Sequence, residues 1–135
     1  MSGNLFSFDR CDINGRNILH QAALREDLGV IMGCKGYIEF DKLDRNGMTP
    51  LFLAIKEECF KSAKYLLNNG ANPNAFNEKF GSVLSLALVK MQFYLVQTML
   101  SRGANPNLQD KDGNTPLHYL FALWKDQPEY LLAGT

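Results

Sequence analysis

Apolar and polar positions along this chain alternate in blocks, with short helix-like stretches separated by polar turn segments. Within each helix-like stretch, apolar residues lie three positions apart, which is the spacing of one buried helix face. The first such column holds Leu19, Leu51, Leu84 and Leu117. The second column holds Ala22, Ala54, Ala87 and Leu120. We expect the alanines to let neighbouring helices approach closely.

The blocks repeat with a nearly constant period. The segment Gly-Ala-Asn-Pro-Asn occurs at 70–74 and again at 103–107, a separation of 33 residues. Gly-x-Thr-Pro-Leu occurs at 47–51 and 113–117, a separation of 66 residues, which is twice that period. Such self-similarity predicts units that pack only on their neighbours. We place four units at 12–43, 44–76, 77–109 and 110–135, the last one truncated, and expect 1–11 to be the tail of a preceding unit.

Each unit is predicted to contain two helices. The column before the first helix holds residues whose side-chain oxygens cap helix N-termini, namely Asn17, Thr49, Ser82 and Thr115. Proline, which is favoured at the first helical position, follows in two of the four units. The second helix is indicated by the triplets Ala63, Leu66, Leu67 and Val96, Met99, Leu100. Gly70 and Gly103 then suit left-handed C-terminal caps.

These residues resemble the ankyrin repeat. The matching segments are Gly47-Met48-Thr49-Pro50-Leu51 with Ala54, Gly113-Asn114-Thr115-Pro116-Leu117-His118, and the two Gly-Ala-Asn-Pro-Asn segments. The resemblance covers roughly residues 9–133. It implies an all-α solenoid of helix-turn-helix repeats with short turn fingers, and a module that binds another protein instead of catalysing a reaction.

Several segments depart from the repeat pattern. Residues 37–41 read Tyr-Ile-Glu-Phe-Asp where later units have Gly-Ala-Asn-Pro-Asn, so we expect an irregular second helix and loop in the first unit. Phe80 occupies a glycine column, with Gly81 one residue late, which predicts a distorted third turn. The last unit is expected to open its second helix at Pro128, after Asp126 or Gln127, and to stop within about two turns.

Composition excludes several classes of protein. The 135-residue chain carries 14 basic and 14 acidic side chains, so it lacks the basic excess of a nucleic-acid binder. It contains no apolar run of the about 18 residues that span a bilayer, and no secretory signal pattern. Cys11, Cys34 and Cys59 form no disulfide framework, which indicates an intracellular protein, cytoplasmic or nuclear.

No catalytic, metal or cofactor site is predicted. His20 and His118 lie in one column three units apart, which at about 8–10 Å per stacked helix separates them by about 25–30 Å. They therefore cannot form an acid–base pair or share a metal ion. In the family that the chain resembles, this histidine supports the turn by hydrogen bonding. No nucleotide-binding, zinc or complete calcium-binding motif is present, and a small-molecule ligand is not expected.

The resemblance places partner contacts on the turn tips and the exposed side of the first helices. Mapped onto this chain, those positions carry seven basic and three acidic residues, which leaves seven basic and eleven acidic residues elsewhere. The prediction is a basic concave face that favours a partner with an acidic surface. The candidate contact residues are Arg16, Arg25, Arg45, Met48, Lys56, Lys79, Lys90, Lys111, Asn114, Tyr119 and Trp124.

Alternative interpretations remain open at this point. Charged turns also serve simply to keep a domain in solution. Trp124 either anchors a partner or packs against a continuation of the solenoid. The leading function is a protein-binding adaptor or scaffold. The alternatives are a structural subunit of a larger assembly and a targeting domain of a longer protein that contains an enzyme.

Overall fold

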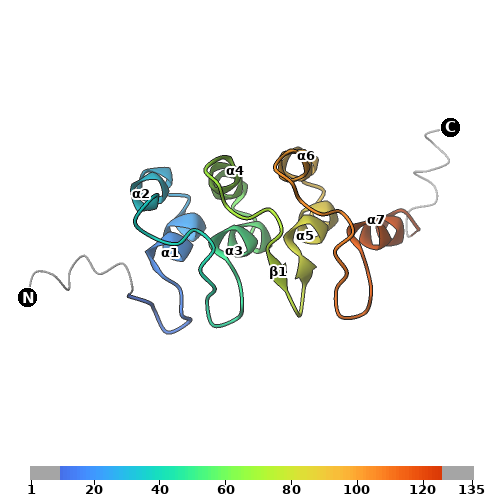
Figure 1. Ribbon diagram of the computed structural model, residues 1–135, viewed down its shortest axis with the longest axis horizontal. Coiled ribbons are helices and arrows are strands. Elements are labelled where there is room, and N and C mark those ends of the chain that lie inside the picture. Colours follow the sequence, from blue (N-terminus) through green and yellow to red (C-terminus); the bar gives the residue numbers. More distant parts are fainter. Residues whose placement is uncertain (1–9, 126–135) are drawn as a thin grey trace, which may run out of the picture.

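The computed structural model describes residues 10–125 of the chain, apart from the side chain of Trp124. The described part contains seven helices in a single row of units (Figure 1). The helices are α1 (Ile18–Arg25), α2 (Leu28–Cys34), α3 (Pro50–Lys56), α4 (Phe60–Asn68), α5 (Val83–Val89), α6 (Phe93–Ser101) and α7 (Pro116–Lys125). They form three antiparallel pairs followed by α7, as the repeat pattern predicts.

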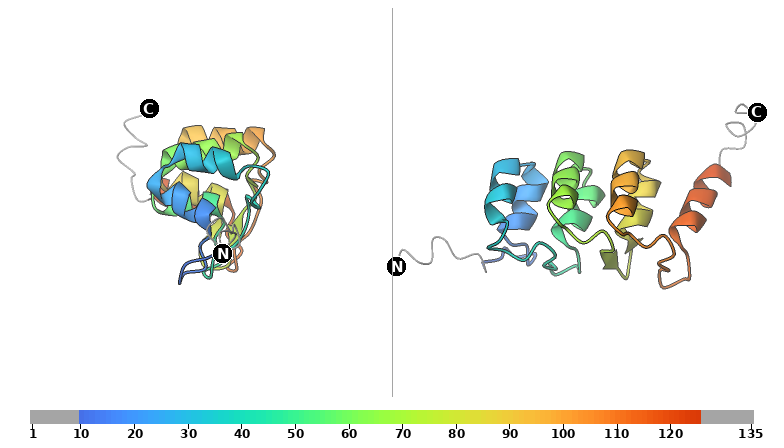
Figure 2. Two further views of the ribbon diagram at one scale, coloured as in Figure 1. Left: turned by 90° about the vertical axis from the view of Figure 1, so that its left-hand side faces the viewer. Right: turned by 45° about the horizontal axis from the view of Figure 1, so that its top comes forward.

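The helices are arranged in two layers with the turns on one side (Figure 2). The first helices, α1, α3, α5 and α7, form the layer nearer the turns, and α2, α4 and α6 form the outer layer. The turn segments at 12–16, 44–48, 77–81 and 110–114, here called fingers one to four, all project to the same side (Figure 1). The predicted solenoid with short turn fingers is therefore confirmed.

The first helices begin where the capping column predicts. The side chain of Asn17 accepts a hydrogen bond from the His20 N–H at 3.0 Å. Thr49 caps α3 in the same way at 3.1 Å, and Ser82 caps α5 at 3.1 Å. Each bond satisfies one of the donors that a helix N-terminus leaves unpaired. Pro50 occupies the first turn of α3, where a missing N–H costs nothing.

The second helices end as the glycines predict. After α4, Gly70 has a φ of 102°, and the Ala71 N–H donates to the Leu66 carbonyl at 2.9 Å. The same arrangement follows α6 at Gly103. This pattern of bonds closes the last turn and redirects the chain back toward the finger layer.

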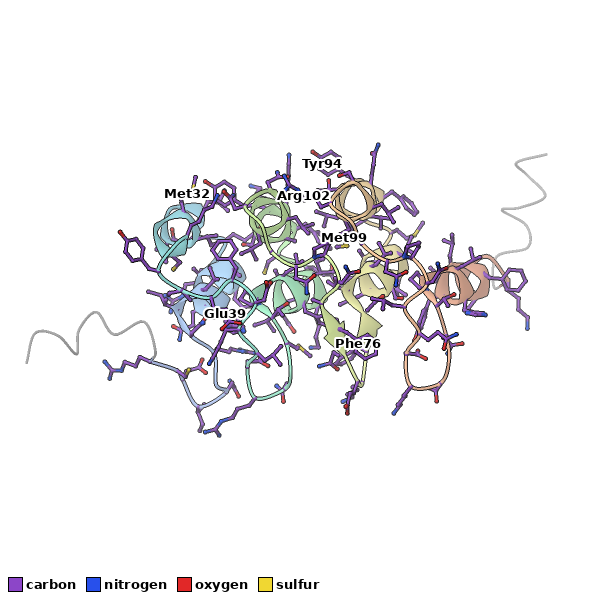
Figure 3. The ribbon with its side chains drawn as sticks, viewed as in Figure 1. Met32, Glu39, Phe76, Tyr94, Met99 and Arg102 are labelled. Atoms are coloured by element: carbon purple, nitrogen blue, oxygen red, sulfur yellow. The ribbon has the colours of Figure 1, made fainter. Side chains whose placement is uncertain are left out.

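The predicted core columns are buried in the first three units. Leu19 and Leu51 are fully covered, Leu84 is nearly so, and Ala22, Ala54 and Ala87 are buried as well. Within α6, Met99 points toward the first-helix layer, whereas Tyr94 lies on the opposite side and is 60% exposed (Figure 3). Each second helix thus uses one face for packing, as its apolar spacing indicates.

Two apolar positions of the predicted core are instead exposed. Leu117 is 69% exposed on α7, and Leu100 is 45% exposed on α6, although their counterparts Leu51 and Leu67 are buried. The expectation of burial is wrong at Leu117 and Leu100. Within the described residues, α7 packs on α5 from one side, and no second helix of the fourth unit covers either position.

The first unit is irregular after its first helix, as expected. Helix α2 has seven residues, whereas α4 and α6 have nine each. One linking bond is nevertheless kept, because the Asp41 carboxylate accepts the Asn72 N–H at 2.9 Å. In the next unit, the Asn74 side-chain oxygen accepts the Asn105 N–H in the same register. Aspartate therefore replaces asparagine as the acceptor that joins consecutive loops.

Finger three has a different backbone from the other fingers. Strands β1 (Phe76–Asn77) and β2 (Gly81–Ser82) pair antiparallel, with Phe76 opposite Ser82. This two-residue ladder is a small departure from the predicted all-α class. The expected distortion of the third turn is present, because the left-handed conformation moves from the usual glycine column to Gly81, whose φ is 82°.

Some expectations concern residues outside the described part of the chain. These are the tail of a preceding unit within 1–11, of which only Arg10 and Cys11 are described, and the short last helix opening at Pro128 after Asp126 or Gln127. The backbone of Trp124 lies in α7, but its side chain is also outside the description, so both interpretations of this residue stay predictions.

Candidate functional site

The two histidines stabilise turns. The buried His20 accepts the Asn17 N–H on Nδ1 at 3.2 Å and donates from Nε2 to the Met48 carbonyl at 2.9 Å. Burial lowers the pKa of His20 below its usual range. His118 accepts the Thr115 N–H on Nδ1 at 2.8 Å. The hydrogen-bonding role implied by the family resemblance is therefore observed for both residues.

Cys34 and Cys59 do not have the surroundings of a nucleophile. Burial raises the pKa of Cys34 and, with Glu26 and Glu57 nearby, that of Cys59. A raised pKa disfavours the reactive thiolate. Within residues 10–125, no cluster of three histidine, cysteine or acidic side chains could hold a metal ion. Among the helices of that same stretch, none has the length and apolar character needed to cross a membrane.

Four of the predicted basic residues are well exposed. Arg25 lies at the end of α1, Arg45 in finger two, Lys79 in finger three and Lys111 in finger four. None of the four forms an ion pair with another residue in the part of the chain that the structure describes. Each therefore presents a cationic group that no described carboxylate pairs with, although the fingers also contain five acidic residues, Asp12, Asp44, Glu78, Asp110 and Asp112.

Two further basic residues are partly neutralised. Lys56 lies 2.9 Å from the Glu57 carboxylate, and Lys90 lies 3.2 Å from the Glu58 carboxylate. Both lysines are half-buried. The Lys90–Glu58 pair joins two consecutive units, and the repeat alignment did not predict it, because Glu58 lies outside the aligned contact positions. These two ion pairs reduce the positive charge that Lys56 and Lys90 contribute to the predicted face.

Arg16 lies beside a buried carboxylate. Its Nε is 3.8 Å from Oδ2 of Asp44, whose side chain is fully buried. The other Asp44 oxygen accepts the N–H groups of Asn46 and Met48, which shapes finger two. Within the described residues, neither Arg16 Nε nor Asp44 Oδ2 has a hydrogen-bond partner. Both of these atoms are buried, so the ion pair lies beneath the surface between fingers one and two.

Three of the other candidates have structural roles. Met48 is only 4% exposed, so its side chain is not available to a partner in this fold. Asn114 is half-buried, and its N–H donates to the Asp110 carboxylate at 2.9 Å. The Tyr119 hydroxyl donates to the same carboxylate, which raises the pKa of Tyr119 to about 12 and lowers that of Asp110. These contacts hold finger four against α7.

A hollow of about 280 Å³ lies among the first three fingers and α3. We call it the Phe80 hollow, and its walls include Arg16, Met48, Leu53, Lys56, Lys79 and Phe80. The Phe80 ring packs against Phe52, with a centroid separation of 6.3 Å. The sequence marked Phe80 only as a turn distortion. Its position in a glycine column, next to lysines of two units, was the signal that could have indicated this site.

Comparison with known proteins agrees with the repeat geometry. The family model for ankyrin repeats in three copies matches residues 3–77, more than half of the 135-residue chain. A putative ankyrin repeat protein, L371, of Acanthamoeba polyphaga mimivirus is 30% identical over 105 residues, covering 76% of this chain and 14% of that protein. The human transient receptor potential cation channel subfamily A member 1 is 31% identical over 110 residues, covering 78% and 10%.

A solved structure supports the same assignment. The ankyrin repeat domain of Bcl-3, a member of the IkappaB protein family, matches with a TM-score of 0.78 and 26% identity. The match covers 84% of this chain and 51% of that chain. The chain thus spans only 14% and 10% of the two relatives above, and about half of the solved domain. With the family model, the capped helix pairs and this structural match in agreement, the chain belongs to the ankyrin-repeat family.

Proposed function

We propose that this domain is a non-catalytic adaptor or scaffold module that binds a partner protein through its finger tips and first-helix face. Ankyrin repeats generally bind proteins, so membership of this family supports protein binding as the general role of the domain. The observation that carries the finer proposal is a set of exposed basic residues that form no ion pair within the described part of the chain: Arg25 at the end of α1, and Arg45, Lys79 and Lys111 on the fingers. We infer that the partner is a protein with an acidic surface. We also infer that binding involves no nucleic acid, no cofactor and no membrane insertion.

Charge complementarity is the physical reason for this choice. Exposed cations without intramolecular partners attract acidic proteins over several ångströms and accelerate their association. The chain as a whole is neutral, so the attraction depends on segregation of charge and not on net charge. An intracellular location is part of the proposal, since the cysteines form no disulfide framework in the sequence.

A matched pair of charge-reversal variants tests the proposal. The face variant replaces Arg25, Arg45 and Lys111 with glutamate. The control variant replaces Lys61 and Lys64 of α4, and Arg102, which follows α6, with glutamate. Quantitative affinity capture from cell extract should show acidic proteins that bind the wild type and the control variant but not the face variant. Equal capture by all three proteins would contradict the proposal.

An alternative function is that the domain works as one part of a longer protein or of a larger assembly. The chain matches 18% of the length of a putative E3 ubiquitin-protein ligase, XBAT35, of Arabidopsis thaliana, with 38% identity over 82 residues. In the alternative proposal, this domain is a targeting domain of a longer protein that contains an enzyme, or a structural subunit of a larger assembly. Sequencing the full transcript distinguishes the targeting alternative from the adaptor. A subunit should co-elute with its assembly in size-exclusion chromatography, and the chain purified alone should be unstable.

A further inference from the structure

We propose that the Phe80 hollow is a specificity pocket that binds the carboxylate side chain of a glutamate in an acidic segment of the partner. This inference rests on the proposed function, because it assigns one contact within the basic face. It goes further by naming the pocket, the residue type that occupies it and the side chains that hold it.

The pocket arises from a local change in finger three. In the other fingers, the column of Phe80 holds a glycine with positive φ, as at Gly47 with 74°. Here the positive φ passes to Gly81, and the aromatic ring at position 80 packs against Phe52 instead of leaving the column empty. The ring provides an apolar wall between the fingers. None of the other three fingers has an aromatic residue at this position.

Two ammonium groups lie against the Phe80 ring. Lys56 Nζ lies 5.6 Å from the ring centroid and Lys79 Nζ lies 5.4 Å from it. Cation–π attraction holds such groups near the ring but does not use up their N–H donors. Lys79 forms no ion pair within residues 10–125, and Lys56 contacts only one carboxylate, that of Glu57. The pair therefore keeps donors for an incoming anion.

Arg16 adds a third cation from another unit. It lines the same hollow, and its buried Nε lies 3.8 Å from Oδ2 of Asp44. Cations from finger one, α3 and finger three thus converge on one place. An incoming carboxylate would receive charge-assisted hydrogen bonds, which are stronger than bonds between neutral groups. The carboxylates of Asp44 and Glu57 balance two of the three cations, and the incoming carboxylate would balance the third.

The dimensions and walls favour a glutamate side chain over other anions. A volume of about 280 Å³ is below the range of about 300–1,000 Å³ that is usual for pockets of small molecules. Leu53 and Phe80 present apolar surface beside the cations, which suits the two methylenes of glutamate. A sugar–phosphate backbone has no such apolar stem and would need a basic excess that the neutral chain lacks.

The test is a titration of the full chain, labelled with nitrogen-15, with a hexaglutamate peptide at low salt, followed by NMR. Hexaglutamine is the neutral control peptide. We expect amide shifts centred on Lys79 and Phe80 with hexaglutamate only. Lys79→Gln and Phe80→Leu should each raise the Kd by about threefold or more. Lys111→Gln removes the same charge from finger four and should have a smaller effect.

Each outcome decides the inference. A larger effect of Lys79→Gln than of Lys111→Gln, with unchanged thermal midpoints, supports the pocket. Equal effects of the two lysine variants overturn the pocket but agree with diffuse attraction by a basic face. Shifts distributed elsewhere, or no hexaglutamate binding, also overturn it. The proposed function fails separately, if the face variant still captures the acidic proteins that bind the wild type.

Discussion

The imidazole of His20 joins the first and second repeats by donating from Nε2 to the backbone carbonyl of Met48 at 2.9 Å. The ring is fully buried, and its other nitrogen accepts the Asn17 N–H. A single side chain therefore supports the start of α1 and the end of finger two. Since a solenoid is stable only through contacts between neighbouring units, this bond contributes directly to cooperativity.

Replacing His20 should destabilise the domain more than replacing His118. His20→Ala removes a buried ring and leaves the Met48 carbonyl unpaired, so we expect a loss of about 2–4 kcal/mol in the free energy of unfolding. His118→Ala is the matched control, because His118 is exposed and its hydrogen bonds stay within its own turn. Urea denaturation followed by circular dichroism measures both. Equal losses would show that the bond between repeats is unimportant.

Stability should also fall with mild acidification because of His20. Burial lowers the pKa of the folded-state ring below its unfolded value of about 6.5. Between these two pKa values the unfolded chain binds a proton that the native chain does not, so the free energy of unfolding decreases as pH falls. Above the unfolded-state pKa, the contribution of neutral His20 to the free energy of unfolding is fully present. Denaturation at about pH 7.5 and pH 5.5 should show the decrease in the wild type and in His118→Gln, and a smaller decrease in His20→Gln.

The repeat columns predicted the fold because each column has one physical task. Asn17, Thr49 and Ser82 differ in size but share an oxygen that caps a helix, so the alignment located every first helix of the first three units. The exposure of apolar side chains on the last described helix, α7, could not be predicted from the columns. Leu117 has the same residue type as Leu51, and only the absence of a packed neighbour in the described structure distinguishes their environments.

The candidate site was predictable in outline and not in detail. The alignment predicted a basic face, but it could not indicate that Lys90 pairs with Glu58 of the preceding unit. It also could not indicate that Met48 is buried while Lys79 is exposed, although both were aligned with turn positions expected to contact a partner. Side-chain direction depends on the local φ, and in finger three the positive φ had moved by one residue.

Close packing of fingers one and two gives a third prediction. A Cβ added at Gly15, where φ is 71°, would lie 2.9 Å from the Arg45 backbone nitrogen. Gly113 has a similar φ of 80° but has no atom within 4 Å of such a Cβ. Both alanine variants incur the left-handed strain, and only Gly15→Ala adds a collision with backbone. We expect Gly15→Ala to be less stable than Gly113→Ala by about 1–3 kcal/mol, measured by urea denaturation. Equal stabilities would contradict the finger contact.

The turns between paired helices provide a stabilising substitution. Met91 has a φ of 58°, in the left-handed region that disfavours a side chain, and it is 62% exposed. Met91→Gly should relieve the strain and raise the free energy of unfolding by about 1 kcal/mol, because little packing is lost.

Met32 provides the matched control for this substitution. It is also a half-exposed methionine, but it lies within helix α2. Met32→Gly should lower stability by about 0.5–1 kcal/mol, because glycine is a poor helix former. Thermal and urea denaturation of both variants against the wild type test the opposite signs. A loss of stability in both variants would contradict the expected relief of backbone strain at Met91.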